Sequence, residues 1–373
     1  MNEFMRIGDI CNILNGYAFK SSKYVADGIR VIRITNVQKG FVEDTNPQYY
    51  PVSEQREIEK YMLCEGDLLM SLTGNVGRVG LLSAEMLPAA LNQRVACIRI
   101  RNPAVIYKPF LFHLLNSDYF ENKCILASQG VAQKNMSTEW LKEYPIPSFS
   151  MDKQMEIASI FDKIDDLIAR RKEQVRNMDQ AVKSRFIELF GDIVLNPFGW
   201  EKDYLGVVCD VRDGTHDSPH YHSTGFPLVT SKNVTGGEID LTDCSLISEA
   251  DFNKINERSK VNMGDIIMPM IGTVGKPVIV NVEPNFAIKN VSLIKFKDDS
   301  RVLNTFVRSL LQSDYFDDAV LSKVRGGTQK FISLGDIRKL AVIVPPMELQ
   351  EQFATFVKQT DKSKLCSKME VAA

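Results

Sequence analysis

The sequence lacks several features that identify common classes of protein. No stretch approaches eighteen uncharged apolar residues, and residues 1–10 carry no apolar run behind a basic stretch, so neither a membrane span nor a secretory leader is expected. Seven cysteines are scattered singly without a CxxC pair, which argues against a zinc ribbon and a disulfide framework. Lysine and arginine total 45 against 47 acidic residues, so no global basic field marks a nucleic-acid binder. These absences favour a soluble, cytoplasmic protein.

Motifs for common catalytic chemistry are also missing. The chain has no GxxxxGK[ST] loop to hold a nucleotide phosphate and no Pro-Asp dipeptide to begin a PD-(D/E)xK nuclease motif. Asn196-Pro197-Phe198 matches part of the NPP[YF] motif of adenine methyltransferases, but the second proline and a glycine-rich cofactor loop are absent. His216, His220 and His222 could be forced into a metal site, but Pro219 interrupts the segment and favours a hydrogen-bonding loop. We therefore predict no catalytic residue, metal or cofactor in the chain itself.

The strongest signal in the 373 residues is an internal duplication. Leu114–Phe120 reads LLNSDYF and Leu310–Phe316 reads LLQSDYF, with six identities in seven positions at an offset of 196. Gly66–Val79 (GDLLMSLTGNVGRV) matches Gly264–Pro277 (GDIIMPMIGTVGKP) at an offset of 198. A period this long exceeds the roughly 20 to 50 residues of solenoid repeats, so each copy must be a domain. The small drift in offset indicates one domain copied once.

Each copy is predicted to be a mixed domain of helices and strands. Ile29–Val37, Asp67–Leu72 and Val95–Ile100 are β-branched or apolar runs bounded by Gly, Asn and Pro, as is typical of strands. Phe110–Lys123 and its copy Thr305–Asp318 have helical patterns. The expected fold class is α+β, with a first recognition domain at residues 1–150 and a second at residues 191–345.

Two helical regions follow the two domains. Residues 151–190 contain no Pro or Gly, and apolar residues recur at threes and fours, which predicts one helix about 60 Å long. A second helical region at 346–373 begins alike, but Thr360, Ser363 and Lys364 replace apolar positions, so it should be shorter or frayed. We expect the two helices to pack as an antiparallel coiled coil that separates the domains, with pseudo-twofold symmetry.

Polar loop residues recur at corresponding places of the two copies. Their side chains are of the types that read base edges and anchor phosphates in DNA. Any one of them could be an ordinary turn residue, but the recurrence of the set favours a DNA-binding surface. The candidates are Thr35, Asn36, Thr73, Asn75, Arg78, Gln93, Arg94, Gln129, Gln133, Lys134 and Asn135 in the first copy, and His216, Ser231, Lys232, Asn233, Thr273, Lys276, Lys289, Asn290, Arg325, Gln329 and Lys330 in the second.

In their order and duplication, these motifs resemble the specificity subunits of type I restriction-modification systems over essentially the whole chain. The resemblance rests on the two glycine-containing loops, the two LLxSDYF segments, GVAQKNMS and GGTQKFIS, the exits IPSFSMDKQMEI and VPPMELQEQF, the junction FIELFGDIVLNPFGW, and RDGTHDSPHYHSTGFPLVTSKNV. It implies a non-catalytic subunit of a DNA adenine methyltransferase and ATP-dependent restriction endonuclease complex. Each of its two target-recognition domains would read one half of a bipartite, asymmetric site in double-stranded DNA.

The resemblance also implies partners. Each helical region would bind one modification (methyltransferase) subunit. The restriction subunits would join the complex through the two modification subunits. S-adenosylmethionine, ATP and magnesium are expected on those partners. Three alternatives stay open from the residues: a specificity chain for a fused methyltransferase-nuclease outside type I systems, an orphan DNA methyltransferase that binds S-adenosylmethionine itself, and a structural scaffold without sequence preference.

Overall fold

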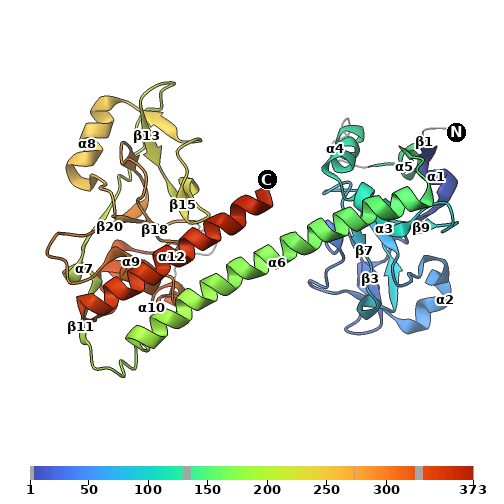
Figure 1. Ribbon diagram of the computed structural model, residues 1–373. Helices are drawn as coiled ribbons and strands as arrows, with labels where there is room; N and C mark the ends of the chain where they lie inside the picture. Colours follow the sequence, from blue (N-terminus) through green and yellow to red (C-terminus); the bar gives the residue numbers. More distant parts are fainter. Residues whose placement is uncertain (1–3, 129–135, 273, 324–330, 373) are drawn as a thin grey trace. The chain divides into compact units, whose positions relative to one another are not determined.

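The structure is a computed structural model that describes residues 4–128, 136–272, 274–323 and 331–372 (Figure 1). The chain forms two compact units, unit 1 (Met1–Leu167) and unit 2 (Ile168–Ala373). The boundary falls inside the long helix α6 (Met151–Phe190), so each unit includes one part of this helix. None of the helices in the described ranges is long and apolar enough to cross a membrane.

Unit 1 is built from strands, short helices and the first part of α6. The strands are β1 (Phe4–Arg6), β2 (Cys11–Asn15), β3 (Ile29–Ile32), β4 (Gly40–Phe41), β5 (Tyr49–Tyr50), β6 (Leu68–Ser71), β7 (Val79–Leu81), β8 (Ala89–Leu91), β9 (Val95–Ile100) and β10 (Pro145–Pro147). The helices are α1 (Ile7–Ile10), α2 (Gln55–Ile58), α3 (Lys108–Leu115), α4 (Asp118–Ala127) and α5 (Thr138–Glu143). β1 pairs with β10, and the other strands form a five-stranded sheet in the order β2-β9-β6-β7-β4 and a three-stranded sheet in the order β5-β3-β8.

The five-stranded sheet of unit 1 is covered on both faces. All four residues of β6 are buried, which explains why the segment reads as a continuous apolar run. Leu68 and Met70 belong to a core cluster that includes Phe110 of α3. Leu69 points the other way and packs in a second cluster with Cys97. The alternation along β6 therefore connects two cores through one strand.

Unit 2 repeats most of this arrangement, with one more strand among its described residues and with a four-stranded sheet in place of the five-stranded sheet. Its strands are β11 (Glu201–Tyr204), β12 (Asp210–Asp213), β13 (Phe226–Val229), β14 (Val234–Thr235), β15 (Glu238–Ile239), β16 (Ser245–Ile247), β17 (Ile266–Pro269), β18 (Val278–Ile279), β19 (Ala287–Ile288), β20 (Val291–Lys295) and β21 (Ala341–Val344). Its helices are α7 (Leu205–Val208), α8 (Glu249–Ser259), α9 (Asn304–Leu310), α10 (Asp314–Ala319), α11 (Leu334–Arg338) and α12 (Met347–Ala372). The sheets have the orders β11-β21, β12-β20-β17-β18, β16-β13-β19 and β14-β15, so the prediction of two similar mixed domains is confirmed.

The repeated sequence motifs occupy equivalent structural positions. The phenylalanines of the two LLxSDYF segments, Phe120 and Phe316, lie at the centres of the two large cores with no exposed surface. The second glycine of the first G-x-V-G loop, Gly77, has a φ of +90°. A β-carbon there would lie 2.8 Å from the β-carbon of Cys124 in α4. Both the backbone conformation and the close packing of the loop on α4 therefore require glycine.

Within unit 2, the end of α6 packs against α12. The rings of Phe186 and Phe190 each lie 5.5 Å from the ring of Phe353. Farther from this contact, the Lys364 ammonium lies 2.7 Å from the Asp179 carboxylate. Because the partner numbers rise along α12 as they fall along α6, the two helices run antiparallel here, as predicted.

The polar residues in α12 do not interrupt the helix. Thr360 donates its hydroxyl hydrogen to the carbonyl of Phe356 (2.9 Å), and Ser363 donates to the carbonyl of Gln359 (3.1 Å). Such bonds to the preceding turn satisfy both hydroxyls without unwinding the backbone. The helix is shorter than α6, as expected, with 26 residues against 40, and it continues through these polar positions to Ala372.

Candidate nucleic-acid interface

Four loops meet at one edge of unit 1, which we call edge 1. They are the loops that follow β2, β3 and β6 and the turn between β8 and β9. Main-chain hydrogen bonds join them, from Gln93 N to Tyr17 O (3.0 Å), Asn92 N to Ile32 O (3.2 Å), Leu72 N to Arg94 O (3.0 Å) and Met136 N to Leu72 O (2.9 Å). Segments that are far apart in sequence are thus brought together where the strands end.

Unit 2 has the same construction, which we call edge 2. Its loops follow β12, β13 and β17, and its turn lies between β19 and β20. The joining hydrogen bonds run from Asn290 N to Thr215 O (3.2 Å), Lys289 N to Val229 O (2.9 Å) and Ile332 N to Met270 O (2.9 Å). The candidate residues in the described loops therefore gather at one edge of each unit.

Edge 1 carries four side chains that are free to meet a ligand. Thr35, Asn75, Gln93 and Arg94 are exposed. Within the part of the chain that the structure describes, none of their side chains has a hydrogen-bond or ion-pair partner. One guanidinium, one hydroxyl and two amides therefore offer donors and acceptors from three different loops.

Two further candidates of edge 1 are partly held by the protein. Arg78 donates from Nη1 to Oε1 of Gln38 (2.7 Å), and Gln38 in turn donates to the carboxylate of Glu43 (2.6 Å). This chain of contacts orients the half-buried Arg78 between two loops. The hydroxyl oxygen of Thr73 is buried and has no hydrogen-bond partner among the described residues.

Asn36 and Asn233 hold equivalent turns and do not face outward. Asn36 is 4% exposed, accepts from the main-chain N–H of Arg33 (3.1 Å) and donates to the carbonyl of Glu43 (3.2 Å). Asn233 is 6% exposed, accepts from the main-chain N–H of Thr230 (3.0 Å) and donates to the carbonyl of Asp243 (3.3 Å). The structure gives both amides a role inside their own turns, in place of the expected contact with DNA.

Edge 2 carries two free ammonium groups and one that is bound. Lys232 and Lys276 are exposed and have no partner among the described residues, while Ser231 is half-buried. Lys289 is 8% exposed, and its ammonium donates to the hydroxyl of Ser218 (2.6 Å). Lys289 therefore fixes the loop after β12, so that, of the candidate lysines the structure describes, Lys232 and Lys276 are available to a phosphate.

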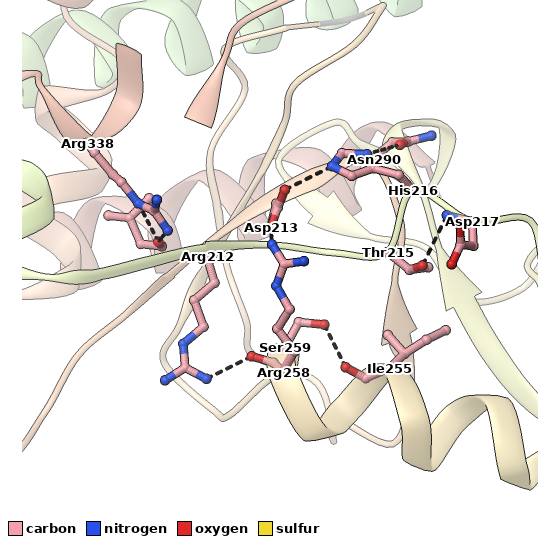
Figure 2. Close-up of polar contacts among 11 residues, drawn as sticks. Arg212, Asp213, Thr215, His216, Asp217, Ile255, Arg258, Ser259, Asn290 and Arg338 are labelled. Atoms are coloured by element: carbon pink, nitrogen blue, oxygen red, sulfur yellow. Dashed lines mark hydrogen bonds and ion pairs between the residues drawn. The ribbon is translucent and has the colours of Figure 1, made fainter. Parts of the chain in front are cut away.

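His216 is held between two oxygen acceptors, as Figure 2 shows. Its Nε2 lies 2.9 Å from Oδ2 of Asp213, and its Nδ1 lies 3.0 Å from Oδ1 of Asn290. Asp213 is 6% exposed and is also paired with Arg258 of α8. The pKa of His216 is raised above its ordinary value, first by the hydrogen bond to Asn290 and then by the hydrogen bond to Asp213.

The other two histidines of the segment, His220 and His222, are exposed and do not join this contact. Among the described residues, no three His, Cys, Asp or Glu side chains are grouped as metal ligands. Within the segment, the described side-chain hydrogen bonds of histidine are those of His216.

Sequence reasoning missed several residues that shape the two edges. Asp213 stands three residues before His216, a spacing typical of a turn, and could have been singled out on that basis. Gln38 and Arg258 had no comparable signal, because their contacts depend on segments 40 and 45 residues away. Eight candidates lie outside the described residues: Gln129, Gln133, Lys134, Asn135, Thr273, Arg325, Gln329 and Lys330.

Two copies of one mixed domain, each presenting polar loop side chains at one edge, define a duplicated recognition protein. The chain matches the family model of the type I restriction modification DNA specificity domain over residues 2–177 and again over residues 197–369. Since the matches span more than half of the sequence, the chain belongs to this family.

Known relatives agree with this assignment. The chain is 25% identical over 382 residues to the type I restriction enzyme EcoBI specificity subunit of Escherichia coli, with 94% of this chain and 77% of that protein covered. It is 21% identical over 384 residues to the EcoKI specificity subunit of E. coli strain K12, with 95% and 80% covered. The crystal structure of the S subunit of the type I system of M. genitalium matches with a TM-score of 0.53 at 15% identity, over 99% of this chain and 91% of that chain. This last similarity shows a shared fold.

Proposed function

We propose that edge 1 and edge 2 are the DNA-reading surfaces of a type I specificity subunit, and that each reads one half of a bipartite, asymmetric site. The observation that carries this proposal is the recurrence of the same loop edge in both units. In each unit, separate loops bring polar side chains that lack a partner within the described ranges to the place where the strands end. Two separate edges suit a site with two separate half-sequences.

The free side chains divide by chemistry into two roles. Thr35, Asn75 and Gln93 have donors and acceptors that suit base edges in the major groove, where a good bidentate contact discriminates by about 1–3 kcal/mol. Arg94, Lys232 and Lys276 are cations that suit phosphates, which fix the register of a protein on the duplex. This division needs no global positive charge, since the basic groups are local.

We further propose that α6 and α12 bind two modification subunits, and through them the restriction subunits. This proposal is supported by an apolar face that unit 1 leaves open on α6. Ile160, Phe161, Ile164 and Leu167 are between 43% and 57% exposed. A contiguous apolar face of this kind on a helix is typical of a protein contact site. The chain would contribute no catalytic group, and S-adenosylmethionine, ATP and magnesium would be bound by the partners.

The experiment that tests this function is a genome-wide map of N6-methyladenine. Cells that express this chain with the modification subunit encoded beside it are compared with cells that express the modification subunit alone. The proposal requires a new bipartite motif that appears only with the chain. If the two proteins copurify and no motif is methylated, the chain is not the reader of that methyltransferase.

A further inference from the structure

The β8–β9 turn of edge 1 and the β19–β20 turn of edge 2 each contain an asparagine, although their main-chain bonds match Asn92 to Lys289 and Gln93 to Asn290. In edge 1, Oδ1 of Asn92 accepts from the main-chain N–H of Arg94 (3.2 Å). In edge 2, Oδ1 of Asn290 is bound by Nδ1 of His216 (3.0 Å). In both cases the amide oxygen is engaged, and the amide nitrogen has no partner within the described ranges. Figure 2 shows the amide nitrogen of Asn290 directed away from His216.

Hydrogen-bond counting fixes the protonation state that this geometry needs. The Asp213 carboxylate and the Asn290 oxygen are both acceptors, so a His216 ring that keeps both bonds with the amide in this orientation donates from both nitrogens, as an imidazolium does. A neutral ring could keep its bond to Asp213, but its other nitrogen would present a lone pair to the Asn290 oxygen. The amide would then have to turn over, which exchanges the outward N–H donor for an outward oxygen.

The charged surroundings of His216 come from three elements. Asp213 at the end of β12 favours the imidazolium, whereas the guanidinium of Arg258 in α8 opposes it. Lys289 in the β19–β20 turn is bound to Ser218. The remaining neighbours line a hollow of about 320 Å³ beside His216 and Asn290, and they are the uncharged residues Met270, Ile271, Phe331, Ile332, Ser333 and Leu334. Asn290 therefore lies at an open, mostly apolar hollow with one polar group directed outward.

We propose that His216 is a positioning residue for DNA reading, which holds the Asn290 amide with its oxygen inward so that its N–H donor selects a base that presents an acceptor. This inference rests on the proposed function of edge 2. In the major groove, guanine, adenine and thymine present acceptors, whereas cytosine presents only its amino donor. Unit 1 has Gln93 at the position of Asn290 and Ala18 at the position of His216, so this contact is specific to edge 2.

The decisive variant is Asn290→Asp in the full chain, assayed with the modification subunit. Aspartate has the same shape and keeps an oxygen toward His216, but it replaces the outward donor with an acceptor. We expect one position of one half-site to shift toward cytosine or adenine, whose amino groups can donate, with at least about a tenfold loss at the original base. The other half-site should not change. His220→Gln, in the same loop but outside the contact, is the matched control and should retain the original motif.

A second variant separates positioning from folding. His216→Ala leaves Asn290 in place but unrestrained, so discrimination should relax at that same position and become independent of pH. In the wild type, discrimination there should relax as the pH rises through the pKa of His216. An unchanged motif in Asn290→Asp, or relaxation spread over both half-sites in His216→Ala, would overturn the inference.

The inference also has a test that does not depend on methylation. An NMR titration of the His216 ring in the full chain should give a pKa above the ordinary histidine value, and Asp213→Asn should lower it. If the pKa of His216 is ordinary, the imidazolium contact is absent and the inference fails. If the wild-type chain directs no methylation while the titration is as expected, the proposed function is wrong and the contact between His216 and Asn290 is confirmed.

Discussion

Single residues at edge 1 show which side chains hold the loops and which are free for a ligand. Gln93 lies in the turn between β8 and β9, and its main-chain N–H is already bound to the carbonyl of Tyr17 (3.0 Å). Its side chain is exposed and has no partner among the described residues. Removing the side chain should therefore leave the turn intact.

We predict that Gln93→Ala relaxes one base position in one half-site by about 1–3 kcal/mol, because one amide contact to a base edge is lost. The measurement is the methylated motif of the complex, compared base by base with the wild type. The other half-site is the internal control. Equal degradation of both half-sites would contradict independent reading by the two edges.

Lys276 of edge 2 should act differently, because it is an exposed cation without a partner among the described residues. We predict that Lys276→Ala weakens DNA binding for all sequences alike and reduces the slope of log K against log salt by about 1. Fluorescence anisotropy of the assembled complex at several salt concentrations measures this. A change in the preferred bases at constant slope would instead assign Lys276 to base reading.

The raised pKa of His216 also predicts a pH dependence of stability. A group whose pKa is raised by folding contributes stability that is full below its unfolded pKa, about 6.5, and is lost as the pH rises through the folded value. Since 62% of the His216 side chain is exposed, the contribution should stay below about 1 kcal/mol. The midpoints of thermal unfolding of the wild type and of His216→Ala should differ at pH 6 and converge at pH 9. A difference that persists at pH 9 would show that it does not come from the protonation of His216.

The sequence predicted the loops of the site better than the side chains that are free in them. The motifs and their spacing identified the segments around Thr35, Asn75 and Gln93, because the duplication repeats them. The burial of Asn36 and Asn233 could not be predicted from the sequence, because an asparagine that closes a turn and one that contacts a ligand have the same sequence pattern. The contact of Asp213 with Arg258 was invisible because it depends on the tertiary position of α8.

At the level of elements, the G-x-V-G loop on α4 has a strict steric requirement. We predict that Gly77→Ala destabilises the protein by about 1–3 kcal/mol or more, because a φ of +90° is unfavourable for alanine and the added carbon would lie 2.8 Å from Cys124. Gly74→Ala is the control: its φ is also positive, but its new carbon would lie at an ordinary 3.7 Å from Ile34. Urea unfolding should show the larger loss for Gly77→Ala, and equal losses would exclude the steric clash.

The antiparallel pairing of α6 and α12 in unit 2 and the shorter length of α12 were both predicted from the sequence. The periodicity identifies where apolar residues face a partner, as at Phe186 and Phe353. It does not identify Lys364, which extends the contact by pairing with Asp179 of α6. Polar residues that find partners can continue a helix interface, and a pattern of apolar residues alone cannot reveal this.

The molecule as a whole shows two units with nearly the same order of elements and different side chains at their edges. Edge 1 has Ala18 where edge 2 has His216. Such differences are expected if the two units read different half-sequences, since the surrounding strands and helices are matched. The fold of each unit is thus compatible with more than one set of reading residues.

The main-chain hydrogen bonds that join the loops of each edge have a consequence for evolution. Because Gln93 N, Asn92 N and Leu72 N donate to carbonyls, the loops are held together largely irrespective of the side chains that they carry. Substitutions at the tips can therefore accumulate without dismantling the scaffold. Because the two edges share no residue, they can also diverge separately. Combining different variants of unit 1 with different variants of unit 2 would then multiply the available specificities.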